Sequence, residues 1–206
     1  MRRRVAVPAI ALLAVLLGAC ASAPGIPETS YFRLPPPAPQ PAGQPPLQTP
    51  IMVETFLADG VHSDQALLYS TDPDGQRLRA YHYQMWVDPP TRMLQRRLIA
   101  SLRQSEVAPL VAGRLPPRSA MWRISGRIEA FERVRRGDGW HVQVALQLRL
   151  DHSDAALPAL VRDYREERAA GGESVRDSVR AFGAAVDAIY AAFIADLCQA
   201  AAGSDA

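Results

Sequence analysis

Cys20 is the residue whose position most clearly suggests chemistry, because it follows a segment built like a secretory signal peptide. Three arginines at positions 2–4 precede an apolar run at residues 5–17. About 20 residues are needed to cross a bilayer core of about 30 Å, so this run is too short to be a transmembrane helix. A charged start, a short apolar middle and small residues at the end are typical of a signal peptide. The sulfur of Cys20 therefore lies at the expected cleavage point, where it could be modified covalently.

The four residues Leu17-Gly18-Ala19-Cys20 resemble the bacterial lipobox, a leucine followed by two small residues and a cysteine. The resemblance implies that Cys20 receives a diacylglyceryl group, that the chain is cut before it, and that its new amine is acylated, for example with palmitate. Two or three acyl chains, each contributing about 0.8 kcal/mol per buried CH₂, form an effectively permanent anchor. We expect residues 1–19 to be a lipoprotein signal peptide. The alternative is an ordinary signal peptide cut near Ala21 or Ala23.

The charge balance argues against a nucleic-acid partner. The chain has 23 basic and 21 acidic residues. Loss of the three signal-peptide arginines leaves 20 basic residues and a net charge of −1, with no overall basic excess. Once Cys20 is acylated, Cys198 is the one remaining cysteine, so an internal disulfide or a cysteine-based metal site is not expected.

No catalytic or metal-binding motif is present. The sequence has no Gly-x-Ser-x-Gly elbow, no His-Glu-x-x-His, no phosphate loop and no dinucleotide fingerprint. The four histidines lack a second ligand at helical metal-binding spacing. His62 and Asp64 share a loop and could meet a serine in space, which would suggest a periplasmic hydrolase. We predict instead a protein that is not an enzyme and that binds no cofactor or metal.

One predicted surface combines several arginines. In a strand predicted at residues 122–131 and its continuation, Arg123, Arg127, Arg133 and Arg135 share one parity, and Arg149 lies on the same face of the partner strand. Five guanidinium groups on one face could bind an acidic partner or lipid phosphates in bidentate fashion. The alternative is a solvated face that Glu129 and Asp151 partly neutralise.

A proline-rich segment separates the anchor from the folded domain. Residues 24–50 contain ten prolines in 27 positions, which excludes a helix and favours an extended conformation. We expect residues 20–50 to be a tether, with a reach on the order of 90 Å when fully extended. Residues 31–34 have strand character and interrupt it, so the tether could be as short as residues 21–30.

The folded domain is expected at residues 51–200, followed by a disordered tail at 201–206. Strands are predicted at residues 51–57, 66–69 and 79–87. A helix is expected next, with Asp88 as its cap and Pro89 as its first residue. Its apolar stripe consists of Leu94, Leu98, Ile99 and Leu102.

The second half of the domain carries the clearest periodicity. Residues 122–131 and 140–150 alternate between apolar and polar, with Phe131 as an exception, and Gly137-Asp138-Gly139 joins them into an antiparallel hairpin. Residues 159–168 fit either a helix or an edge strand. Ser174 and Asp177 form a predicted capping box for a final helix of about 25 residues. Gly183 inside that helix suggests a close neighbour. The pattern indicates a single α/β domain with a mixed, largely antiparallel sheet packed with two main helices.

Several stretches together resemble the auxiliary lipoprotein component of ABC-type transport systems, a family that includes the paraquat-inducible (Pqi-type) lipoproteins. They are Tyr31-Phe32-Arg33-Leu34, Leu67-Leu68-Tyr69, and the aromatic run from Tyr81 to Trp86 that ends in Pro89-Pro90 before a leucine-rich helix. The resemblance implies an α/β domain without catalytic residues, and a strand at residues 159–168. Tyr83 and Trp86 are either interface or core residues.

The resemblance also implies the partners. They are an MCE-domain (mammalian cell entry) protein and its ABC permease and ATPase, which traffic lipid across the periplasm. Phospholipid is a further candidate partner of this chain. Ala21 is not the Asp that often retains lipoproteins in the inner membrane, which favours the periplasmic face of the outer membrane. Homo-oligomers are compatible with this reading. A second hypothesis is a lipid carrier, which would need an apolar cavity of several hundred Å³ between helix and sheet.

Overall fold

A computed structural model of the chain describes residues 27–39, 47–72, 74–116 and 120–204. The expected signal peptide, Cys20 and the end of the expected tail lie outside these residues. The helices are α2 (Pro90–Gln104) and α3 (Val175–Ser204), and η1 (Gly60–Ser63) is a short 3₁₀ turn. The strands, in chain order, are β1 (Ser30–Phe32), β2 (Ile51–Val53), β3 (Leu57–Ala58), β4 (Ala66–Ser70), β5 (Arg79–Trp86), β6 (Val111–Ala112), β7 (Trp122–Arg136), β8 (Gly139–His152) and β9 (Leu160–Ala169).

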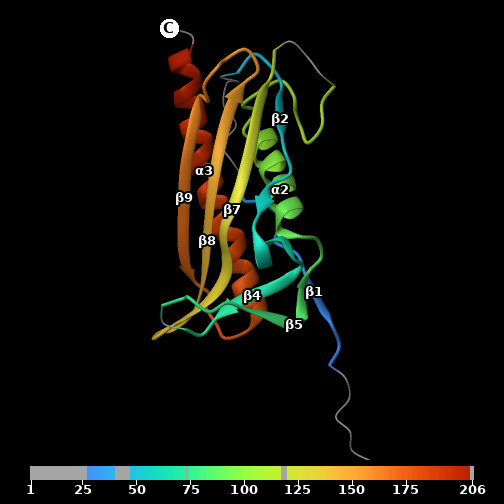
Figure 1. The fold of residues 1–206 in the computed structure, drawn as a ribbon, viewed down its shortest axis with the longest axis vertical. Coiled ribbons are helices and arrows are strands. Elements are labelled where there is room, and N and C mark those ends of the chain that lie inside the picture. Colours follow the sequence, from blue (N-terminus) through green and yellow to red (C-terminus); the bar gives the residue numbers. More distant parts are fainter. Residues whose placement is uncertain (1–26, 40–46, 73, 117–119, 205–206) are drawn as a thin grey trace, which may run out of the picture.

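The strands form one mixed sheet, with both helices behind it in the view of Figure 1. The two long ladders, β7 with β8 and β8 with β9, are antiparallel. The short strands β2, β3 and β4 all pair with β7 in parallel, and β5 returns antiparallel to β4. The predicted α/β class with a mixed, largely antiparallel sheet and two main helices is therefore confirmed, and residues 159–168 are a strand.

Strand β7 runs the length of the domain and sets its two ends. Its 15 residues correspond to about 46 Å at about 3.3 Å per residue. Ile51 of β2 pairs with Trp122 at one end, while Ser70 of β4 pairs with Val134 near the other. In the order of the sheet, β5 lies next to β4 and β1 lies next to β5. Both strands are therefore at the Arg136 end, which is at the bottom of the view in Figure 1.

A β-bulge between Ile128 and Ala130 interrupts the alternation of β7. A bulge inserts one extra residue, so the side chains that follow it change face. Ile124 and Ile128 point to the core before the bulge, and Phe131 does so after it. The exception at Phe131 in the sequence pattern marks this shift.

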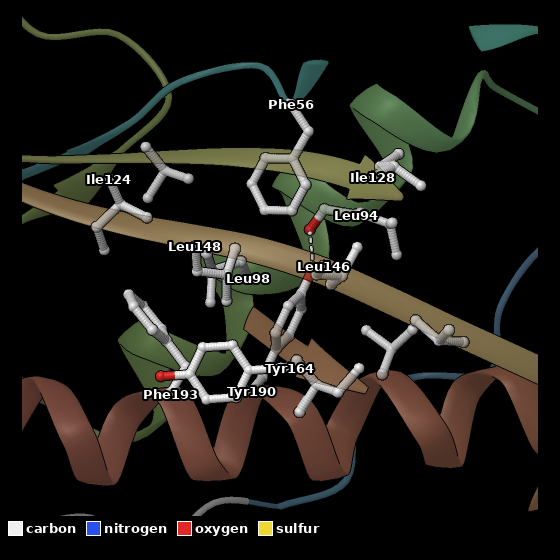
Figure 2. Packing of buried hydrophobic residues seen from close by; sticks show 14 of the residues in the cluster. Phe56, Leu94, Leu98, Ile124, Ile128, Leu146, Leu148, Tyr164, Tyr190 and Phe193 are labelled. Carbon is white, nitrogen blue, oxygen red and sulfur yellow. Dashed lines mark hydrogen bonds between the residues drawn. The ribbon is translucent and has the colours of Figure 1, made fainter. Parts of the chain in front are cut away.

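The core fills the space between the sheet and the helices (Figure 2). Leu94 and Leu98 of α2 and Phe193 of α3 are fully buried, and they face Leu146 and Leu148 of β8. The hydroxyl of Tyr190 donates a hydrogen bond of 2.8 Å to the backbone carbonyl of Leu94, which joins the two helices inside the core.

Helix α3 begins as predicted, whereas α2 does not. The Ser174 Oγ accepts the backbone N–H of Asp177 at 3.1 Å, and Asp177 Oδ2 accepts the backbone N–H of Ser174 at 3.2 Å, which completes the capping box. Pro89, not Asp88, is the N-cap of α2, and no side chain caps it. The Asp88 carboxylate instead forms an ion pair with Arg96, nearly two turns into the helix. By length and apolar composition alone, residues 175–200 could cross a membrane, but half of that stretch is buried in the domain.

The strand predicted at residues 51–57 is divided into β2 and β3 by Phe56. The Phe56 ring lies directly over Gly126 of β7, where a Cβ atom would be 2.8 Å from three ring carbons. Residues 54–56 leave the strand conformation, and the ring is buried in the core. A glycine is thus required at position 126, because the Phe56 ring lies too close to the β7 backbone to leave room for a Cβ atom.

We predict that Gly126→Ala lowers the free energy of unfolding by about 1–3 kcal/mol, because the added methyl group overpacks a rigid core site. Urea denaturation of the purified chain measures this change. Gly137→Ala is the matched control, since a Cβ there meets nothing within 4 Å. Equal stability of the two variants would contradict the assigned role of Gly126.

Candidate functional site

A buried ion pair joins the two helices. Arg97 of α2 donates from Nε to Asp187 Oδ1 and from Nη2 to Asp187 Oδ2 of α3, both at 2.8 Å. The side chains are 6% and 14% exposed. Two parallel bonds between guanidinium and carboxylate fix both distance and orientation. We refer to Arg97 and Asp187 as the helix clamp.

The helix clamp also holds the segment that enters the domain. Arg97 Nη1 donates to the backbone carbonyl of Pro35, and Nη2 lies 3.4 Å from the carbonyl of Pro36. The backbone N–H of Ala38 donates to Asp187 Oδ2 at 3.0 Å. The Pro35 ring packs on Gly183, where a Cβ would lie 3.0 Å from Pro35 Cδ. The close neighbour that Gly183 suggests is therefore the proline segment.

Strand β1 fixes the same segment to the sheet. Tyr31 pairs with Met85 and Phe32 with Trp86 in a parallel register, and Val87 donates its N–H to the Phe32 carbonyl at 2.9 Å. The domain boundary expected at residue 51 differs from this arrangement, because residues 30–38 already contact the sheet and both helices. The shorter alternative, a tether of residues 21–30, agrees with these contacts.

The β-bulge between Ile128 and Ala130 divides the surface of five arginines that the alternation of the sequence predicted. Arg123, Arg127 and Arg149 lie on the open face of the sheet, but each has a carboxylate partner. The N–O distances are 3.3 Å from Arg123 to Glu54, 2.6 Å from Arg127 to Asp59, and 2.7 Å from Arg149 to Asp151. The five arginines predicted to share one face are not brought together.

Arg133 and Arg135 follow the bulge and point to the other face, opposite Val142 and Trp140. Arg133 is 2% exposed, and its guanidinium carbon lies 4.1 Å from the centre of the Trp140 ring. It donates to the Tyr81 hydroxyl at 2.5 Å. Burial lowers the pKa of Arg133, and the Tyr81 contact partly opposes this. Arg135 pairs with Glu173 at 2.7 Å. Arg133 is therefore a packing residue.

The two aromatic candidates separate into one core and one surface residue. Trp86 is 1% exposed and packs against Phe131 and Phe182, with ring centres 5.3 and 5.5 Å away. Tyr83 is 39% exposed. It borders an open groove of about 580 Å³ along β5, which Tyr69 and Tyr81 also line.

The histidine loop does not assemble a catalytic triad. His62 Nε2 lies 3.1 Å from Glu132 Oε2, and Ser63 donates to the Gly60 carbonyl instead of to His62. In the part of the chain that the structure describes, no three His, Cys, Asp or Glu side chains are grouped to hold a metal ion.

Burial raises the pKa of the Cys198 thiol, which leaves less reactive thiolate at neutral pH.

The space between α3 and the sheet is occupied by side chains. Phe182, Val186 and Phe193 on α3 are at most 2% exposed, and they meet Val144 and Leu146 of β8. The grooves along β5 and beside the proline segment, about 580 and 560 Å³, open at the surface. This packing offers no room for an acyl chain where a carrier would hold one.

Comparison with known proteins agrees with this architecture. A family model described as "ABC-type transport auxiliary lipoprotein component" matches residues 32–195. A crystal structure of a Xanthomonas campestris protein of the DUF330 family has a TM-score of 0.72 at 16% identity, covering 85% of this chain and 99% of that one. A hypothetical protein from Chlamydia trachomatis has a TM-score of 0.52 at 6% identity, covering 75% and 98%. These TM-scores show a shared fold. No curated protein matches the chain.

We predict that Asp187→Ala lowers the free energy of unfolding by about 3–5 kcal/mol, because it leaves the Arg97 charge buried without a partner. Urea denaturation measures the loss, and hydrogen exchange should show faster exchange at Ala38 and in β1. Asp59→Ala removes the partner of exposed Arg127 and should cost about 0–1 kcal/mol. If the two substitutions cost the same, the helix clamp does not organise the domain.

Proposed function

Because this chain belongs to the family of ABC-type transport auxiliary lipoprotein components, we propose that it is a lipid-anchored, non-enzymatic part of an MCE-type lipid-trafficking system. The observation that carries the proposal is the family match, which spans residues 32–195. It includes Phe32 at the end of β1, both helices up to residue 195 and the whole sheet after β1. The transport complex would supply an MCE-domain protein, a permease and an ATPase as partners.

The anchor follows from the lipobox-like Leu17-Gly18-Ala19-Cys20. We propose that Cys20 is the acylated first residue of the mature chain and that the domain lies on the periplasmic face of the outer membrane. Strand β1 begins ten residues after Cys20. The domain would therefore sit close to the membrane surface, since ten residues span at most about 36 Å.

The packed interior supports a docking role over that of a carrier. A carrier must enclose apolar lipid tails, and ligand cavities usually measure about 300–1,000 Å³. Here the interface between α3 and β8 is closed by large side chains. We propose that the domain contacts the transporter with its surface and that lipid passes through partner proteins.

We predict that the membrane-extracted protein carries its lipids on Cys20. Intact and N-terminal peptide mass spectrometry should show a chain that starts at Cys20 with a diacylglyceryl group and an amide-linked acyl chain. Cys20→Ala should retain residues 1–19 and carry no lipid. An unlipidated chain that starts at Ala21 or later would contradict the proposed anchor.

We further predict that the tagged protein, purified from solubilised membranes, brings down an MCE-domain protein and its ABC partners without a stoichiometric lipid. Cys20→Ala serves as the matched control and should recover much less of the complex, because it is not placed at the membrane surface. Mass spectrometry of proteins and extracted lipids provides both readouts. Stoichiometric lipid on the chain in the absence of a transporter would replace the docking role with a carrier role.

A further inference from the structure

The point at which the chain enters the domain is fixed at one end of the molecule. β1 pairs with β5, and residues 35–38 are held by Arg97 and Asp187. The β1 end and the opposite end, where Leu110 and the loop after β8 lie, are separated by the length of β7, about 46 Å. Figure 1 shows β1 and β5 together at the lower end. A covalent link of ten residues to Cys20 reaches at most about 36 Å, so it keeps the β1 end near the bilayer.

Exposed tyrosines gather at this end. Tyr31 of β1 is 63% exposed, and Tyr83 of β5 is 39% exposed. The two lie on paired strands, because Gln84, which follows Tyr83, is opposite Ser30, which precedes Tyr31. Tyrosine has an apolar ring and a polar hydroxyl, and it is enriched where apolar and aqueous layers meet at a membrane.

Unpaired arginines flank the same two strands. Arg33 follows β1, Arg79 is the first residue of β5, and Arg77 lies two residues before it. All three are exposed and have no ion-pair partner among the residues that the structure describes. The carboxylate of Asp72 accepts the backbone N–H of Gln76 at 3.2 Å and does not pair with them. On the open sheet face, by contrast, Arg123, Arg127 and Arg149 are all neutralised. A guanidinium without a carboxylate is available to bind phosphate in bidentate fashion.

We infer that the end of the domain formed by β1 and β5 is a membrane-contact surface. It rests on the bilayer that holds the chain's own anchor, with Tyr31 and Tyr83 in the interfacial layer and the three arginines on lipid phosphates. This inference depends on the acyl anchor proposed above. It goes further by assigning which surface faces the lipid and which faces the periplasm.

The test uses the full acylated chain with Cys198→Ala, so that one introduced thiol carries a fluorophore. Ala80→Cys places the label on β5, and Ala156→Cys places it in the loop after β8 at the other end; both alanines are exposed. The proteins are reconstituted in vesicles of phosphatidylethanolamine and phosphatidylglycerol (3:1) with or without lipids that carry a nitroxide quencher on the headgroup. We expect quenching at position 80 to exceed that at position 156 at least threefold.

A matched pair of double variants separates contact from mere proximity. Tyr31→Ser with Arg33→Glu removes one exposed ring and one unpaired arginine at the β1 end, and should reduce quenching at position 80 at least twofold. Leu110→Ser with Arg114→Glu makes comparable changes to exposed residues at the far end and should leave it unchanged. An equal effect of the two would overturn the inference.

Flotation of the vesicles reports on the anchor separately. A chain that does not float overturns both the anchor and the contact surface. A chain that floats but shows equal or no quenching at the two positions overturns the surface alone. If position 80 is not quenched by lipid but becomes protected when the copurified MCE-domain protein is added, this end binds protein and the membrane assignment is wrong.

Discussion

Arg97 and Asp187 connect three parts of the chain that are distant in sequence. Neither charge can remain buried alone, so α2, α3 and the entering segment must reach their positions together. The chemistry of proline explains why an arginine is suited to this place. Pro35 and Pro36 carry no N–H, so they offer no donor to a neighbouring carbonyl. The Arg97 guanidinium supplies donors to the carbonyls of both prolines from one fixed plane. The pair therefore sets the orientation of the helices and the entry point of the chain at once.

The sequence predicted the structure best where the conformation depends only on residues that are near neighbours in the chain. Period-two alternation identified β7 and β8, and Ser174 with Asp177 identified the start of α3, because both depend on near neighbours. The face of Arg133 could not be derived by counting parity through a bulge, although Phe131, an apolar residue at an odd position, marked the point where parity changes. The role of residues 30–38 was also beyond local rules, since their partners lie on β5, α2 and α3.

The distribution of charge gives the surface of the domain two different characters. Arginines on the open sheet face are held by carboxylates from the same chain, so that face has little unbalanced charge for a ligand. Those near β1 and at the start of β5 lack such partners in the described residues. The family to which the chain belongs is described as a transport auxiliary lipoprotein component.

The parallel pairing of β1 with β5 has a mechanical consequence. If the chain is held by the proposed lipid on Cys20, it would be pulled whenever the domain moves away from the bilayer, and the force would enter the sheet at Ser30, along the axis of β1. The hydrogen bonds of β1 run across that axis, so they carry the load together in shear instead of opening one after another. After this strand, the next contacts that resist such a force are the packing of the Pro35 ring on Gly183 and the hydrogen bond from Arg97 to the Pro35 carbonyl. If Cys20 is the proposed lipid anchor, residues 30–38 would carry tension from the anchor before it reaches the hydrophobic core.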